Sequence, residues 1–228
     1  MTDLTPEEQR VLGALLEKQY VTPDVYPMTM NGLLAASNQT SNRNPVVRYE
    51  ESTVHRALDG LREKGLLRIV YSPSNRATKY RQVFEEERRL TRHEAAVLCV
   101  LLLRGPQTVG ELRGRTERLA TFASLEEVEA VLGGLARRED EALVRRLERQ
   151  PGQKDARWVH LLGEVRVAEA ADGDGDGGRD GDGRGSAPPI APAPGAERVA
   201  ALEAEVASLR ADLDELRQDF DALRADLT

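Results

Sequence analysis

An internal repeat constrains the fold of this chain more than any other feature. The pattern of Leu4–Leu16 returns in Leu90–Leu102, with seven matched residues at a constant offset of 86. Each copy has threonine at a predicted N-cap, glutamate three residues later, and apolar residues at helical spacing. A second match, between Val54–Leu61 and Val128–Leu135, has an offset of 74. The first copy therefore holds about a dozen additional residues, which we place in the polar run Asn38–Pro45.

After its third predicted helix, each copy continues into two short β-rich segments around a turn that contains proline. The segments are Leu66–Tyr71 and Thr78–Phe84 in the first copy, and Leu143–Arg149 and Arg157–Leu162 in the second. Such a pair predicts a β-hairpin. Three helices followed by a hairpin is the order of a winged helix. We therefore predict a mostly α protein with small β-hairpins (α+β), built from two tandem winged-helix domains at 1–86 and 87–165.

The composition changes abruptly after the second copy. Residues 172–185 are five Asp, seven Gly and two Arg, and a run rich in Pro and Ala follows. Neither run holds enough apolar surface to offset the entropy of ordering, so we predict a disordered linker over 166–196. Over 197–228 apolar residues step alternately by three and four, which predicts a coiled coil. Its a and d positions are Val199, Leu202, Val206, Leu209, Leu213, Leu216, Phe220, Leu223 and Leu227.

Charged residues beside this apolar stripe favour a parallel homodimer. With Val199 at position a, each g residue of one chain meets the next e residue of its partner in pairs of opposite charge. The pairs are Glu205–Arg210, Asp212–Arg217 and Asp219–Arg224. An antiparallel pairing would set mostly arginine against arginine and aspartate against aspartate. The alternative is a single helix that folds back onto its own chain.

The net charge of −7 is distributed unevenly. Residues 164–228 hold 7 Lys or Arg against 16 Asp or Glu, whereas residues 1–163 hold 25 against 23. The acidic balance thus belongs to the predicted linker and coil, and it does not exclude a polyanionic partner for the rest of the chain. No signal-peptide pattern and no apolar run of roughly 20 residues is present, and Cys99 is the only cysteine. We expect a cytoplasmic protein with no membrane partner.

Several longer strings in both copies match the pattern of a known family. They are Leu15–Gln19, Thr22–Asn31, Asn38–Val46, Asn75–Tyr80, Leu101–Arg113 and Leu135–Asp140. In these strings the chain resembles the YceH-like bacterial proteins, a family of unknown function. The resemblance covers about residues 1–163 and the terminal coil, while the Asp/Gly-rich linker departs from it. It implies a tandem winged-helix fold and a DNA-binding role, and it supplies neither a substrate nor catalytic residues.

The third helix of a winged helix commonly enters the major groove, while the hairpin contacts phosphates. In the first domain Val54, Ala57, Leu58 and Leu61 form the predicted core stripe. The DNA-binding hypothesis therefore names the polar residues around it. They are Ser52, Thr53, His55 and Arg56 on the helix, Asn42, Arg43 and Asn44 in the insertion, and Arg76 and Lys79 on the hairpin. Such side chains reach base edges or phosphates. The alternative is a solvated helix face with ordinary surface charges.

The second domain differs in charge at the equivalent helix. It presents Glu126, Glu127 and Glu129, which phosphates would repel. Its hairpin, with Lys154 and Arg157, remains a candidate for backbone contact. We expect this domain to pack on the first or to bind another protein. The leading hypothesis is a dimeric regulator of transcription that binds double-stranded DNA, and the alternative is a protein-interaction scaffold.

No pattern in the sequence indicates catalysis or a cofactor. Asp172–Gly183 matches the start of an EF-hand loop, but glycine occupies the twelfth position, where a glutamate is required. His55, His93 and His160 are not at metal-ligand spacing, and Cys99 lies in an apolar run that predicts core packing. No phosphate-binding glycine loop or nucleophile motif appears. We expect no enzyme activity, no metal and no cofactor.

Overall fold

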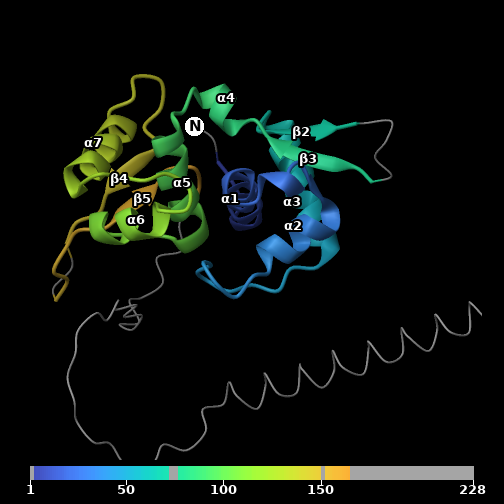
Figure 1. Cartoon of the computed structure of the whole chain (residues 1–228), viewed down its shortest axis with the longest axis horizontal. Helices are drawn as coiled ribbons and strands as arrows, with labels where there is room; N and C mark the ends of the chain where they lie inside the picture. Colours follow the sequence, from blue (N-terminus) through green and yellow to red (C-terminus); the bar gives the residue numbers. More distant parts are fainter. Residues whose placement is uncertain (1–2, 72–76, 150–151, 165–228) are drawn as a thin grey trace, which may run out of the picture. The chain divides into compact units, whose positions relative to one another are not determined.

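The computed structural model describes residues 3–71, 77–149 and 152–164, which belong to one compact unit, Met1–Asp172 (Figure 1). Arg76, the predicted linker and the predicted coiled coil lie outside the described residues. The described part is mostly helical with two small antiparallel sheets, which confirms the α+β class. The assignment of each copy to the winged-helix class stays a prediction.

The first copy of the repeat contains three main helices and a three-stranded sheet. Its elements are α1 (Pro6–Val21), η1 (Pro23–Val25), β1 (Met28–Thr29), α2 (Met30–Ser37), α3 (Glu51–Glu63), β2 (Leu67–Val70), β3 (Lys79–Gln82) and α4 (Phe84–Arg88). The strand order is β1–β3–β2, and Tyr80 of β3 lies opposite both Met28 and Ile69. The predicted hairpin is confirmed. Strand β1 was not predicted, because two residues are too few to show an alternating pattern.

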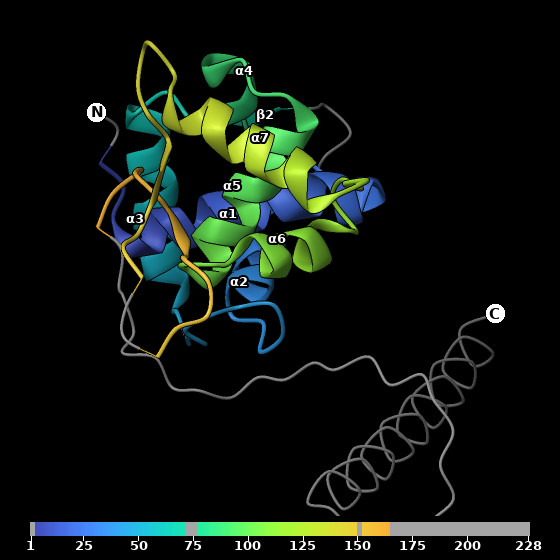
Figure 2. The same ribbon diagram turned by 90° about the vertical axis from the view of Figure 1, so that its left-hand side faces the viewer.

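The second copy contains the same three helices and a smaller sheet. Its elements are α5 (Arg92–Arg104), α6 (Val109–Thr116), α7 (Leu125–Ala136), β4 (Val144–Arg146) and β5 (Trp158–His160). Strands β4 and β5 are antiparallel, with Arg145 opposite Val159. Helices α6 and α7 pack on α5, on the side of it that faces the viewer in Figure 2. The second predicted hairpin is confirmed.

Side-chain caps fix the start of the equivalent helices α1 and α5. The Thr5 hydroxyl accepts a hydrogen bond from the backbone N–H of Glu8, and the Glu8 carboxylate accepts one from the N–H of Thr5. Thr91 and Glu94 repeat this capping box at the start of α5. An N-cap contributes roughly 1 kcal/mol to helix stability. The local threonine–glutamate signal therefore defines both helix starts, as the repeat predicts.

The additional residues of the first copy lie in two places. The offset between equivalent helix starts is 86 for α1 and α5, 79 for α2 and α6, and 74 for α3 and α7. Seven additional residues therefore precede α2 and five lie between α2 and α3. The prediction that placed them all in Asn38–Pro45 is wrong in part. The first group forms η1 and β1, because Pro23 and Pro27 cannot donate the backbone hydrogen bonds that would continue α1.

The equivalent helices α1 and α5 pack directly against each other (Figure 1). A β-carbon on Gly13 of α1 would lie 2.9 Å from the Leu103 side chain, so glycine permits this close approach. The Cys99 thiol donates to the carbonyl oxygen of Gly13 at 3.4 Å, and burial raises the pKa of that thiol. Gly13 and Cys99 are equivalent positions of the repeat. Contact between equivalent positions is the arrangement expected close to a two-fold axis.

A second contact region joins the start of the chain to the end of the second copy. The N–H of Leu4 donates to the carbonyl of Leu162 at 2.7 Å. The Gln9 side-chain amide donates to the carbonyls of Leu4 and Glu164 at 2.9 and 3.0 Å. Gly163 has a φ of +146°, and a β-carbon there would overlap the backbone carbonyl oxygen of Leu4.

We expect Gly163→Ala to lower the free energy of unfolding, because alanine must adopt an unfavourable φ and displace the backbone at Leu4. The conformation alone costs roughly 1–3 kcal/mol. Urea denaturation measures the effect, with Gly114→Ala in α6 as the matched control. A β-carbon on Gly114 would have nothing within 4 Å, so this helix should gain stability from alanine. Equal unfolding midpoints for the two variants would contradict the contact at Leu4.

Candidate nucleic-acid interface

Helix α3 has one buried face and one polar face. Val54, Ala57, Leu58 and Leu61 are all at most 3% exposed and form its buried stripe. The helix packs with this stripe on α1 and α2. The predicted core stripe of the third helix is therefore confirmed. Because the stripe is buried, the residues between the stripe positions lie on the opposite side of α3.

The outward residues at the start of α3 carry varied hydrogen-bonding groups. Ser52, His55 and Arg56 are exposed and Thr53 is half-buried. Arg56 donates from Nη2 to the Thr53 hydroxyl at 3.3 Å. A guanidinium has five N–H donors, so most of the donor capacity of Arg56 faces solvent. Four of the predicted residues are thus brought together on one surface, which we call the α3 face (Ser52, Thr53, His55 and Arg56).

Acidic residues flank the α3 face. Asp59 lies 3.0 Å from Nδ1 of His55 and 3.4 Å from Nη2 of Arg62, so a guanidinium and an imidazole both border its carboxylate. Glu50 and Glu51 are exposed at the start of the helix. Neither caps the helix with its side chain, since Glu50 is the N-cap and makes no such bond. The face is therefore polar and mixed in charge, not uniformly basic.

The β2–β3 hairpin follows α3 and contributes Lys79 and Tyr71. Arg68 and Arg81 of this hairpin are paired with Glu87 at 3.8 Å and Glu86 at 2.6 Å. Lys79, opposite Val70, has no ion-pair partner in the described part of the chain. Tyr71 is 82% exposed at the end of β2. Sequence reasoning missed this tyrosine, although an aromatic residue next to a predicted turn is a usable signal.

Arg43, a predicted DNA contact, is buried and does not lie on the α3 face. Its side chain has no exposed area and makes a bidentate ion pair with Glu17, at 2.7 and 3.1 Å. Its Nε also donates to the carbonyl of Ala36 at 3.1 Å, and Nη2 donates to Gln39 at 2.8 Å. Arg43 therefore supports the α2–α3 loop (residues 38–50) from inside.

The two asparagines of the α2–α3 loop lie against α5. The N–H of Asn44 donates to the carbonyl of Leu103 at 2.9 Å, and the Asn42 side chain accepts a hydrogen bond from Arg104. Asn42 has a φ of 58°, a conformation that asparagine tolerates. Both residues are exposed, but their contacts join the loop to the last turn of α5 and not to the α3 face.

The equivalent helix of the second copy begins with carboxylates. Glu126 and Glu129 are exposed on α7, and Glu127 accepts a hydrogen bond from the N–H of Ala123 at 2.7 Å. Arg157, a predicted hairpin cation, is engaged with Glu111 at 2.9 Å and with the carbonyl of Pro106 at 3.0 Å. Lys154 is exposed. The structure thus keeps Lys154 as a candidate and assigns Arg157 to the support of the hairpin.

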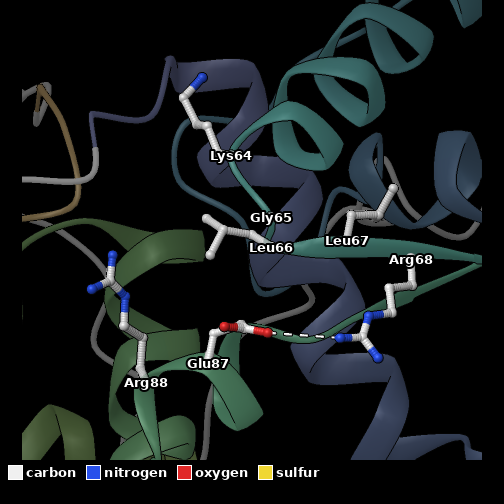
Figure 3. A pocket seen from close by; sticks show the side chains of 7 residues that line it. All are labelled: Lys64, Gly65, Leu66, Leu67, Arg68, Glu87 and Arg88. Atoms are coloured by element: carbon white, nitrogen blue, oxygen red, sulfur yellow. Dashed lines mark ion pairs between the residues drawn. The ribbon is translucent and has the colours of Figure 1, made fainter.

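A polar pocket of about 400 Å³ lies between the turn after α3 and helix α4 (Figure 3). Its lining residues are Lys64, Gly65, Leu66, Leu67, Arg68, Glu87 and Arg88. Its cations already meet carboxylates: Lys64 lies 2.6 Å from Glu8, Arg68 lies 3.8 Å from Glu87, and Arg88 lies 3.0 Å from Glu141. These ion pairs stabilise the junction of the elements, and we assign no ligand to the pocket.

The described residues contain no cluster of His, Cys, Asp or Glu that could hold a metal ion. None of the helices in the described ranges is long and apolar enough to cross a membrane. Fold and surface together define a mostly helical α+β protein with a duplicated helical unit, whose third helices present a mixed polar face in the first copy and carboxylates in the second.

The chain belongs to the DUF480 family, whose model, described as a protein of unknown function, matches residues 4–153. A UPF0502 protein of Solibacter usitatus is 49% identical over 204 residues, covering 89% of this chain and 91% of that protein. One of Opitutus terrae is 52% identical over 168 residues, 73% of each chain. One of Geobacter sulfurreducens is 48% identical over 211 residues, 89% and 88%. The resemblance to a bacterial family of unknown function is confirmed.

Proposed function

We propose that this protein binds double-stranded DNA as a non-enzymatic regulator of transcription, with the first copy acting as a winged helix. The observation that supports the proposal most is the composition of the α3 face. It combines hydroxyl, imidazole and guanidinium groups, whereas the equivalent turn of α7 presents Glu126, Glu127 and Glu129. Two copies of one fold have thus diverged at the positions where a winged helix contacts base pairs.

The groups of the α3 face suit a major groove. Arginine pairs with two acceptors of guanine, and serine or threonine hydroxyls pair with any base edge. Lys79, on the adjacent hairpin, is placed to contact phosphate as a point charge. Glu50, Glu51 and Asp59 limit the number of phosphate contacts near this face. We therefore infer that contacts with the bases contribute more to the binding affinity of this site than its net positive charge does.

The predicted coiled coil completes the proposal. Its heptad pattern and the opposite charges at its e and g positions favour a parallel homodimer, which would bring two α3 faces to one duplex. These residues lie outside the described part of the chain.

One observation favours the alternative, a protein-interaction scaffold. The outward side of α7 combines the exposed carboxylates of Glu126 and Glu129 with Leu125, which is 44% exposed. A basic partner protein would complement this surface.

We expect the double variant Arg56→Gln/Lys79→Gln to bind a mixed-sequence duplex at least tenfold more weakly than the unmodified chain. Hydrogen bonds to charged groups contribute roughly 1.5–3 kcal/mol each, and a factor of ten corresponds to about 1.4 kcal/mol. Fluorescence anisotropy on labelled duplex measures the affinity. Arg118→Gln is the control, because Arg118 is exposed and lies outside the α3 face and both hairpins. Equal affinities for the double variant and the control would overturn the assignment of the α3 face.

A further inference from the structure

The β4–β5 hairpin carries three exposed arginines that the sequence-based hypothesis did not name, beside Lys154, which it did name. Arg145 and Arg146 are both exposed on β4, and Arg149 and Lys154 are exposed nearer the turn. Successive residues of a strand point to opposite faces. The side chains of Arg145 and Arg146 therefore leave the ribbon on opposite faces and both reach solvent, although the paired Val159 is buried.

These cations are not held by carboxylates. Within the described ranges, Arg145, Arg146 and Lys154 have no ion-pair partner, and Arg149 only donates to the backbone carbonyl of Lys154 at 3.5 Å. Arg157 differs, because Glu111 neutralises it. Glu148 and Asp155 are the acidic residues among the described positions of the hairpin, so the exposed ribbon has an excess of two positive charges.

The base of the ribbon is firmly fixed. Trp158 of β5 exchanges two backbone hydrogen bonds with Gln107, at 2.7 and 3.0 Å, on the edge away from β4. Leu143, Val144 and Val159 are at most 2% exposed and anchor the two strands in the core. The cations thus stand on a rigid support, so binding would require little ordering of the backbone.

The segment that follows the ribbon and the turn that follows α3 both contact the start of the chain, at Leu4 and at the first turn of α1. Leu4 is hydrogen-bonded to Leu162, just after β5, and Glu8 is paired with Lys64, just after α3. Both α3 and the gold-to-orange segment that contains the ribbon appear at the left of Figure 2, while Figure 1 shows them on opposite sides of the α1–α5 pair. A partner bound at the α3 face therefore has the ribbon on the same body, at a fixed separation.

We propose that the β4–β5 hairpin is a second DNA-contacting element, which binds the phosphodiester backbone through Arg145, Arg146, Arg149 and Lys154. The inference rests on the proposed function and extends it to the second copy. The carboxylates of α7 keep that helix out of the groove, while the guanidinium groups of the ribbon contact phosphates. Because phosphates are the same at every base pair, this contact adds affinity without sequence preference.

The test compares two double variants of the full chain that lose equal charge. Arg145→Gln/Arg146→Gln removes the two β4 cations, and Arg118→Gln/Arg137→Gln removes two exposed arginines elsewhere. Each phosphate contact contributes about 0.9 to the slope of log affinity against log salt. We expect the ribbon variant to bind mixed-sequence duplex with a slope shallower by about 2 for each bound chain. The control variant should keep the slope of the unmodified chain. Unchanged thermal unfolding would show that both variants are folded.

Three results separate the ribbon from the α3 face. A ribbon variant with the slope of the unmodified chain overturns the inference and leaves the proposed function intact. Equal loss of slope in ribbon and control variants also overturns it, since net charge alone would then explain binding. Absence of binding by the unmodified chain at low salt overturns both proposals together.

Discussion

Replacement of Arg43 by methionine is expected to lower the free energy of unfolding by roughly 3–5 kcal/mol, a large fraction of the stability of a typical domain. The guanidinium is fully buried, and it satisfies Glu17, Gln39 and the carbonyl of Ala36 at once. Without it, the Glu17 carboxylate stays mostly buried and no other cation forms a bidentate ion pair with it. Urea denaturation at neutral pH measures the loss.

The pKa of Glu17 supports this expectation. Burial alone would raise that pKa, but the hydrogen bonds and charge of Arg43, together with the charge of Lys18, hold it below its ordinary value. The ion pair thus stabilises the fold above the ordinary pKa of glutamate, and this contribution is lost as the pH falls through the lowered pKa.

Two further variants serve as controls for the effect of Arg43→Met on the free energy of unfolding. Arg48→Met changes an exposed arginine of the same loop and should cost little. The double variant Glu17→Met/Arg43→Met should recover much of the loss, because it leaves no buried charge without a partner. If Arg43→Met and Arg48→Met unfold at the same urea concentration, the ion pair does not stabilise the fold as described.

Stability is also expected to fall as the pH decreases from about 6.5 to 4, because of His160. Burial lowers the pKa of His160 to about 4, and its Nδ1 accepts a hydrogen bond from the N–H of Leu162 at 3.3 Å. The unfolded chain binds a proton near pH 6.5. Between the two values the unfolded state holds the proton and the folded state does not, so stability decreases with falling pH. The full difference corresponds to about 3 kcal/mol.

A pH series of denaturation curves measures this effect. His160→Gln removes the titrating group. Whatever the stability of the variant at neutral pH, its free energy of unfolding should therefore change much less between pH 6.5 and 4.5 than that of the unmodified chain. This window lies above the range in which most carboxylates titrate. Parallel pH dependence for the variant and the unmodified chain would show that His160 is not the cause.

Local signals in the sequence explain the part of the fold that could be predicted. Thr5 and Glu8 interact within one turn, so the helix start is visible in a few residues of sequence, and the same holds for Thr91 and Glu94. Helical spacing likewise predicted the buried stripe of α3. The split of the insertion was not predictable, because an offset between two motifs gives the number of extra residues and not their position.

Long-range contacts explain what was missed at the candidate site. Arg43 resembles any cation of a polar loop until Glu17, 26 residues earlier, is seen to face it. Arg145 and Arg146 are neighbours in a strand. When one face of a sheet packs on the core, alternate residues of a strand are buried, so only one of the two would be expected to be exposed. Whether the side chains on both faces of a strand reach solvent depends on what packs beside the strand in the folded protein. Contacts of that kind leave no local trace in a sequence.

The pairing of α1 with α5 changes how the duplication is understood. Gly13 and Cys99, which are equivalent residues, meet at the interface, and both copies belong to one compact unit. The second copy differs from the first in the charge of its third helix, while its hairpin has a cationic surface. In the proposed complex the β4–β5 hairpin of the second copy therefore adds its phosphate contacts to those of the α3 face.

The most direct test is the affinity of the full chain for a mixed-sequence duplex across a salt series. Lys79 and the four cations of the ribbon predict a log–log slope of about −4.5 for each bound chain, since each phosphate contact contributes about 0.9. Binding that weakens along such a line supports DNA contact by both copies. Absence of binding at low salt, or an affinity that does not change with salt, would contradict DNA contact by either copy.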